Sequence, residues 1–255
     1  MRIERKVGAT VAVLGSLLLA VSGTAPAFAH TGPSAGLRFG GLRLAVPAPA
    51  TSTTFGGWAF GPKAAKSVTA KYKVPKLKCG TAVSGVGPIA VFANGSSSNP
   101  NFNAAGLIMQ CMGGKAAMVA AVVVGTKQKA GTVPPVAGDL IQVTITSSTT
   151  KTTATVKDLT KGHTFTVTLS GKGGASVQEL LIDDSLANSS TGKQLPLANF
   201  GAMAFTSAAV SGKAIGTVTP RVQVNMQTAK KVLQISAGPI TGTMKNMFTN
   251  TWKHS

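Results

Sequence analysis

Alternation of apolar and polar residues constrains this chain more than any other feature of its sequence. In residues 68–74 every second side chain is apolar, and Thr or Lys stands between. The same period of two recurs in several segments separated by Gly, Pro, Ser and Asn clusters: 141–145, 153–157, 164–169, 222–226 and 232–235. This period is typical of strands with one buried face. We therefore expect an all-β fold, an antiparallel two-sheet β-sandwich.

Only the apolar run 116–124 leaves its secondary structure open. Its pattern fits a helix or a strand that is buried on both faces. The chain has 255 residues, of which 44% are hydrophobic, so it is long and apolar enough to bury one sizeable core. We expect a single sandwich domain over residues 55–255.

The first 29 residues resemble a secretory signal peptide. Arg2, Arg5 and Lys6 precede an apolar run, and Ala27-Phe28-Ala29 offers small residues for cleavage. A retained membrane anchor is the alternative, but Gly, Thr and Ser interrupt a run that is shorter than the roughly 20 residues of a membrane helix. Residues 30–54 are rich in Gly, Pro and Ala, which predicts a linker or short pro-segment. With no later membrane span, we expect a secreted, extracellular product.

The expected export allows the two cysteines to be interpreted. An even pair in an oxidising compartment usually forms a disulfide, which predicts a bond between Cys79 and Cys111. A nucleophilic cysteine is the alternative, but neither residue has a histidine close in sequence. The bond would stabilise the fold by about 3 to 4 kcal/mol on the chain-entropy model.

The charge of the chain is strongly one-sided. Lys and Arg number 25 against 6 Asp and Glu, which gives a formal net charge of +19. Clustered basic residues with interleaved aromatics would indicate nucleic-acid binding, but the basic residues are spread out and aromatics make up only 5%. Few carboxylates imply acid tolerance instead. Weak adhesion to anionic cell-wall polymers would use the same charge.

Motifs for other chemistries are weak. Three histidines and two cysteines do not supply a structural metal site, so we expect no metal. His163 and His254 stand in a turn and near the C-terminus, which does not favour a Ser-His-Asp triad. The acidic cluster lies in 176–184, where Glu179 and Asp183 would be roughly 13 Å apart on a strand, too far for a glycosidase carboxyl pair.

In order along the chain, several segments resemble the eqolisins, or glutamic peptidases. They are Gly57-Trp58-Ala59, the strand 68–75 ending in Val-Pro, Leu107-Ile108-Met109-Gln110, Ala137-Gly138-Asp139, the segment 178–184, Leu195-Pro196 with Asn199-Phe200-Gly201 and Phe205-Thr206, and Met247-Phe248 with Thr251-Trp252. The family consists of secreted, acid-active endopeptidases built as β-sandwiches. Segment 178–184 is similar to the strand with the catalytic Glu, and 107–110 to the strand with the catalytic Gln.

The resemblance implies a mechanism without cofactors. Glu179 would act as general base on the attacking water and then as general acid, and the Gln110 amide would donate to the oxyanion. Trp58 would line the substrate cleft. The expected protein is a monomeric endopeptidase that cleaves polypeptides.

Departures from the family pattern support a second hypothesis. Segment 118–123 lacks the family's aromatic residues and acid, Asn94 stands where the family has Asp, and Leu180 replaces a Trp. The alternative is therefore a catalytically degenerate sandwich that acts as a secreted binding or cell-surface protein.

Overall fold

The computed structural model describes residues 50–61, 65–96, 99–124, 127–170, 176–186 and 194–254. The expected signal peptide, 1–29, and positions 30–49 of the expected linker lie outside the described residues.

The described chain is almost entirely strand. A short 3-10 helix, Ile215–Thr217, is its one helical element. The strands are β1 (Ala50–Ser52), β2 (Phe55–Phe60), β3 (Ser67–Lys73), β4 (Ser84–Ser96), β5 (Asn99–Met112), β6 (Lys115–Val124), β7 (Lys127–Ala130), β8 (Leu140–Ser147), β9 (Lys151–Asp158), β10 (Thr164–Ser170), β11 (Ser176–Asp184), β12 (Ala202–Val210), β13 (Lys213–Ala214), β14 (Arg221–Gln227), β15 (Leu233–Ala237) and β16 (Phe248–Trp252). The all-β prediction is confirmed.

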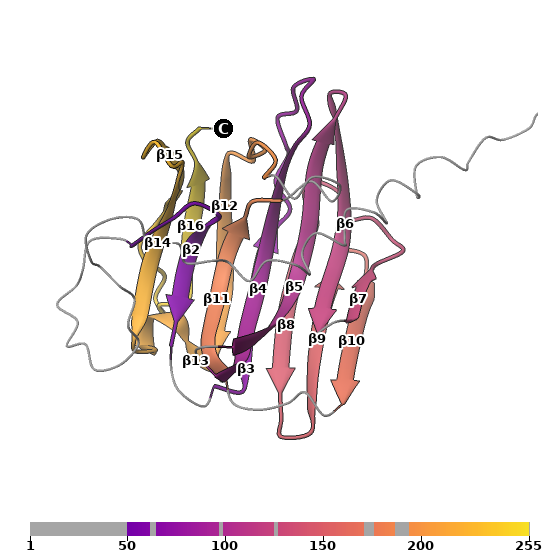
Figure 1. Ribbon diagram of the computed structural model, residues 1–255. Helices are drawn as coiled ribbons and strands as arrows, with labels where there is room; N and C mark the ends of the chain where they lie inside the picture. Colours follow the sequence, from indigo (N-terminus) through magenta and orange to yellow (C-terminus); the bar gives the residue numbers. More distant parts are fainter. Residues whose placement is uncertain are drawn as a thin grey trace, which may run out of the picture.

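One continuous hydrogen-bonded sheet contains all of these strands. Its order is β10-β9-β8-β3-β12-β16-β15-β14-β2-β11-β4-β5-β6-β7, with β1 paired to β14 and β13 paired to β12. Every pairing is antiparallel except that of β1 with β14. Figure 1 shows the strands running along roughly one direction, with β14 and β15 on one side of the molecule and β6, β7 and β10 on the other.

The sheet folds over so that its two halves pack together as layers. Strands β4, β5 and β6 lie against β8, β9 and β10. Alternate residues of both halves meet in one core, for example Val143 and Ile145 of β8 and Leu107 and Met109 of β5. This packing is the expected two-layered sandwich. We call the side that faces the opposite layer the inner face, and the other side the outer face.

The ambiguous apolar run, 116–124, is a strand. It forms β6, which pairs with β5 on one side and β7 on the other. Before the expected domain start at Phe55, β1 already belongs to the sheet and pairs with Val224, Asn225 and Met226 of β14. The described end of the expected linker is therefore part of the fold.

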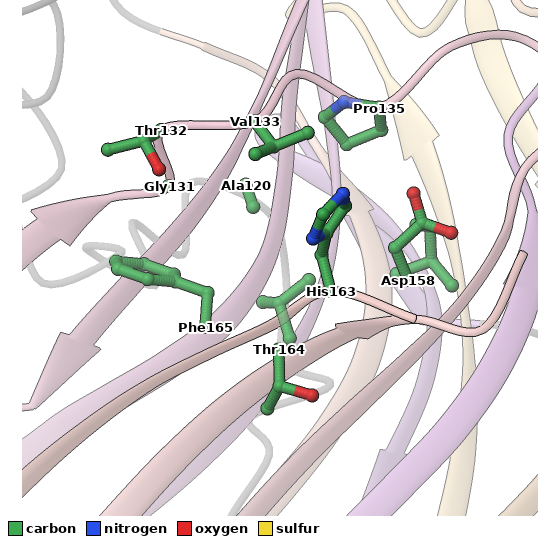
Figure 2. Close-up of a pocket in the computed structure, with 11 residues that line it drawn as sticks. Ala120, Gly131, Thr132, Val133, Pro135, Asp158, His163, Thr164 and Phe165 are labelled. Carbon is green, nitrogen blue, oxygen red and sulfur yellow. The ribbon is translucent and has the colours of Figure 1, made fainter. Parts of the chain in front are cut away.

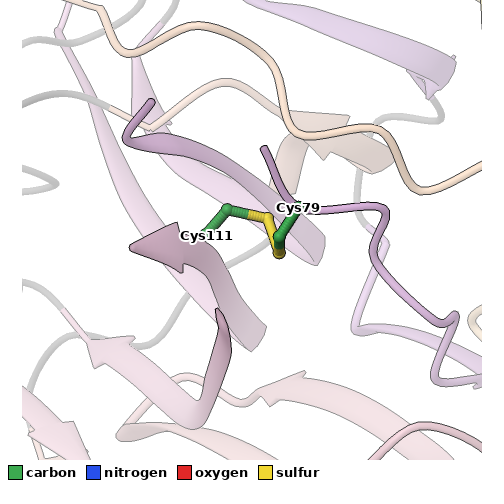
Figure 3. Close-up of a disulfide and its surroundings, with 2 residues drawn as sticks. All are labelled: Cys79 and Cys111. Carbon is green, nitrogen blue, oxygen red and sulfur yellow. A yellow bond between two sulfur atoms is a disulfide. The ribbon is translucent and has the colours of Figure 1, made fainter. Parts of the chain in front are cut away.

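The predicted disulfide is present. Cys79 and Cys111 are joined, with their Cα atoms 5.3 Å apart (Figure 3). Cys111 is fully buried on the inner face of β5, so the bond ties the end of this strand to the segment that follows β3. In the described part of the chain, no helix has the length and apolar character needed to cross a membrane.

Candidate active site

The predicted catalytic acid belongs to β11, in the interior of the sheet. This strand pairs with β2 and β4, and Glu179 stands opposite Phe60 and Phe92. Two residues further on, Leu181 stands opposite Trp58, and both belong to the core between the layers. Because alternate residues of a strand share a face, the backbone register places position 179 on the inner face.

Between β14 and β6, the row of paired positions that contains Glu179 crosses six strands. From β14 to β6 it consists of Arg221, Phe60, Glu179, Phe92, Asn103 and Val124. We call this row the Glu179 rung. Phe60, Phe92 and Val124 are completely buried, and Asn103 is 1% exposed. The rung thus places one aromatic residue on each side of the acid, and an amide on β5, the strand beyond β4.

Asn103 was not identified from the sequence. Its Nδ2 donates to the backbone oxygen of Phe92 at 3.2 Å. At the usual strand spacing, the Cα atoms of positions 103 and 179, which lie two strands apart, are about 9.6 Å apart. Alternation offered a signal, because residue 103 has the same parity on β5 as the buried Met109 and Cys111. Alternation along β5 could not show which residue of β11 lies in the same row as Asn103.

Gln110 does not lie on the Glu179 rung. It stands opposite Gly85 on β4 and Ala117 on β6, seven residues beyond Asn103 on the same strand. That separation is roughly 24 Å along β5. Its neighbour Ile108 packs in an outer-face cluster with Leu186. The structure therefore does not bring Gln110 and Glu179 together, because the register places them on opposite faces and at different heights.

The Gln110 side chain is nevertheless buried. It is 1% exposed, and neither Nε2 nor Oε1 has a hydrogen-bond partner. Leu186 covers this part of the outer face, and a Cβ atom added to Gly85 would lie 2.7 Å from its Cδ1. A buried amide without partners costs stability.

Trp58 lies two positions along β2 from Phe60 of the Glu179 rung, on the same face. Its side chain is 8% exposed, and Nε1 donates to the backbone oxygen of Gly238 at 3.0 Å. The indole therefore packs in the core. A role for it in substrate binding stays a prediction.

A second polar group is buried on the inner face further along β11. Asp183 is completely buried, and its Oδ2 accepts a hydrogen bond from Asn250 Nδ2 at 2.9 Å. The same nitrogen donates to the backbone oxygen of Gly56 at 3.1 Å. Asp183 Oδ1 and Asn250 Oδ1 have no partner. Two acceptor oxygens without a donor suit a protonated carboxyl, which can itself donate.

Burial has the largest effect on the pKa of Asp183. It raises the pKa of Asp183 to about 7, although the Asn250 hydrogen bond opposes the shift. Burial also raises the pKa of Asp184 to about 7, although this residue is partly exposed. Tyr72 reaches the region from β3 and donates from Oη to the backbone oxygen of Pro88 at 3.1 Å. Burial and the charge of Asp183 raise the pKa of Tyr72 well above its usual value.

The two remaining described acids form a separate cluster with a cation. Lys161 Nζ lies 2.7 Å from Asp139 Oδ2 and 4.0 Å from Asp158 Oδ2. Burial alone would raise the pKa of Asp139, but hydrogen bonds from Lys161 and from the Val136 N–H outweigh burial and lower it. This cluster ties the loop before β8 to the turn between β9 and β10.

A cavity of about 140 Å³ adjoins that cluster between the layers (Figure 2). Figure 2 shows the imidazole of His163 between Pro135 and Asp158 at its wall. Asp158 Oδ1 accepts hydrogen bonds from the N–H groups of Thr160 and Lys161, so it closes the turn. The lining includes neither Ser nor Cys, and His163 is exposed at the turn as expected. The cavity holds no nucleophilic triad. Among the described residues, no group of three or more His, Cys, Asp or Glu could hold a metal ion.

Comparison with known proteins identifies a sequence family. A family model described as the Peptidase A4 family matches residues 52–243. This span includes β11 and both strands that pair with it. A search of the curated proteins returned no significant match.

Solved structures agree with the family match in fold. Scytalido-glutamic peptidase, in a crystal structure with a peptide-based transition state analog, is similar at a TM-score of 0.63 and 19% identity, covering 79% of this chain and 98% of that chain. SCP-B, a member of the eqolisin family in complex with the tripeptide Ala-Ile-His, is similar at 0.60 and 19%, covering 79% and 98%. Aspergilloglutamic peptidase from Aspergillus niger is similar at 0.52 and 18%, covering 68% and 99%. At such identities these likenesses establish the β-sandwich fold.

Proposed function

Because this chain belongs to the Peptidase A4 family, the eqolisins, over residues 52–243, we propose that it is a secreted, acid-active endopeptidase whose reacting carboxyl is Glu179. Membership makes it a peptide-bond hydrolase of the glutamic type, with polypeptides as substrates. The observation that carries the proposal is this family match, which spans Glu179 and its neighbouring strands β2 and β4.

The proposed reaction needs one carboxyl and one water. The water oxygen attacks the carbonyl carbon of the peptide bond while Glu179, as carboxylate, takes the water proton. The carbon–nitrogen bond then breaks, and the protonated Glu179 gives its proton to the leaving nitrogen. The developing oxyanion needs a hydrogen-bond donor. Position 179 on a central strand suits this task, since sites on strands are held more rigidly than sites on loops.

Secretion and activity in acid are supported by separate features. The basic and apolar N-terminal segment resembles a signal peptide. The disulfide between Cys79 and Cys111 is typical of oxidising compartments. The protonated form of Asp183 suits an acidic medium, because its pKa of about 7 keeps the buried group neutral there.

A degenerate binding protein is the second candidate, and one observation favours it. The positions on either side of Glu179, Phe60 and Phe92, are both completely buried. The excess of basic residues would then serve weak adhesion to anionic cell-wall polymers. Lys73, Lys151 and Lys157 are exposed and have no ion pair among the described residues. Retention on such a polymer that decreases steeply with added salt would support adhesion.

The deciding experiment compares the purified protein with its Glu179→Gln variant on denatured casein from pH 2 to 5. We expect the natural protein to cleave and the variant to lose activity by about 1,000-fold, because proton transfer by a positioned carboxyl contributes on the order of 100- to 10,000-fold. Equal melting temperatures would show that both are folded. Negligible cleavage by both proteins would instead favour the binding role, and equal activity in both would exclude Glu179 as the reacting group.

A further inference from the structure

The Glu179 rung contains one side-chain amide, that of Asn103 on β5. We infer that Asn103, and not Gln110, is the amide that acts with Glu179, a conclusion that rests on the proposed function. Asn103 is a positioning residue in this inference, because it orients the carboxyl and its attacking water and itself neither gives nor takes a proton.

The backbone register places Asn103 and Glu179 at the same level of the sheet. Asn103 and Glu179 both pair with Phe92, from the two sides of β4, so they occupy the same row. Met109 and Leu181, on the same two strands with the same parity, belong to the core between the layers. The two positions therefore share the inner face, with Cα atoms about 9.6 Å apart. An asparagine and a glutamate side chain that are linked through one water can bridge such a gap.

A hydrogen bond to the backbone fixes the orientation of the Asn103 amide. The Nδ2 of Asn103 donates to the backbone oxygen of Phe92 at 3.2 Å, which holds the plane of the amide against β4, the strand between Asn103 and Glu179. A primary amide carries two N–H donors and an acceptor oxygen, so it can serve a carboxylate and a water at once. With 1% exposure, it acts where bulk water does not compete for these hydrogen bonds.

The competing amide has none of these properties. Gln110 faces the opposite side of the sheet, in the region covered by Leu186, and it is roughly 24 Å further along β5. Its two polar atoms lack partners, so no bond fixes its orientation. Moving it to the Glu179 rung would require a register shift by an odd number of residues, which would turn every core side chain of β5 outward.

Four variants test the inference. Asn103→Leu removes the amide at nearly constant volume, and Asn103→Asp adds a carboxyl at the same place. Gln110→Met is the matched control, because it removes the other buried amide of β5. Glu179→Gln tests the proposed function itself. For each protein, kcat and KM on one peptide substrate are measured from pH 2.5 to 6.5, and thermal unfolding verifies the fold.

We expect Asn103→Leu to lower kcat by about 100-fold with little change in KM, as for loss of one positioned donor. Asn103→Asp should move the acidic limb of the kcat profile to higher pH by about one unit, because a neighbouring carboxylate disfavours the charged form of Glu179. This shift would show that position 103 is close enough to act on the Glu179 carboxyl, and the rate of Asn103→Leu shows whether the amide itself is needed. Gln110→Met should retain the kcat of the natural protein.

Different failures identify different errors. If Glu179→Gln is inactive, Gln110→Met loses activity and the Asn103 variants keep both rate and pH profile, then the inference is overturned and the proposed function stands. If Glu179→Gln is as active as the natural protein, the proposed function is wrong and the inference fails with it. Should Asn103→Leu not fold, the pH profile of Asn103→Asp decides, and an unmoved limb rejects the role of Asn103.

Discussion

Two buried acids of this molecule have pKa values that are shifted in opposite directions. Asp183, on β11, has an amide as its partner and no cation within the described structure, and burial raises its pKa to about 7. Asp139, before β8, has the ammonium of Lys161 at 2.7 Å, and its pKa is lowered. The comparison shows that the neighbours decide whether a buried carboxyl stabilises the fold in its neutral or in its charged form. The stability contributions of the two acids therefore depend on pH with opposite signs.

The largest effect expected from this comparison is a loss of stability as the medium becomes neutral. The native pKa of Asp183 lies above the unfolded value, so its contribution is fully present below about pH 3.8 and is lost as the pH rises through about 7. The free energy of unfolding should fall by up to about 4 kcal/mol between pH 4 and pH 7.5. Asp183→Asn keeps the shape and cannot ionise, so its stability should change much less. Urea unfolding at both pH values measures the difference, and equal losses in the two proteins would contradict the assignment.

A smaller effect of opposite sign is expected at the paired acid. Lys161→Met should lower the free energy of unfolding by about 1.5 kcal/mol at pH 7, since Asp139 loses a charged hydrogen-bond donor that is itself partly exposed. The pKa of Asp139 is lowered in the fold below its ordinary value of 3.8, so this loss should disappear as the pH falls through that lowered pKa and the carboxyl becomes protonated. Lys157→Met, at an exposed lysine, is the matched control and should be nearly neutral. A loss that persists in acid would mean that the lysine stem, rather than its charge, is what matters.

The smallest effect concerns a buried polar group without charge. Gln110→Met should raise the free energy of unfolding by about 1 kcal/mol, because it removes an amide that has no partner and keeps a similar volume. This gain should be the same at pH 4 and pH 7.5, since no titrating group is involved. Denaturant unfolding at both pH values is the measurement. A loss of stability would show that the amide has a partner in solution, such as a bound water.

Alternation along the chain predicted most of the fold, for a simple reason. A strand with one face in the core must show a period of two, so segments such as 68–74 and 141–145 correspond closely to β3 and β8. The run 116–124 could not be assigned in this way. It pairs on both sides within the sheet as β6, and it shows no alternation because all of its residues are apolar.

Alternation along the chain predicted less of the candidate site than of the fold. The Glu179 position could be assigned to a strand, and alternation already implied that Gln110 faces away from its neighbour Cys111. Nothing local to β5 indicates that Asn103 shares a row with Glu179, because that row depends on where the turn between β4 and β5 falls and on how β11 aligns with β4. Asn250 was missed for a related reason, since it meets Asp183 from a strand 67 residues later.

The sequence by itself determined the strands, the antiparallel sandwich class and the pairing of Cys79 with Cys111, because these follow from local periodicity and from there being two cysteines. Only the tertiary structure decided which amide shares a row of the sheet with Glu179 and which acid has no cation among the described residues. Both outcomes depend on the register between strands distant in sequence, and a shift of one residue would reverse the face of every side chain.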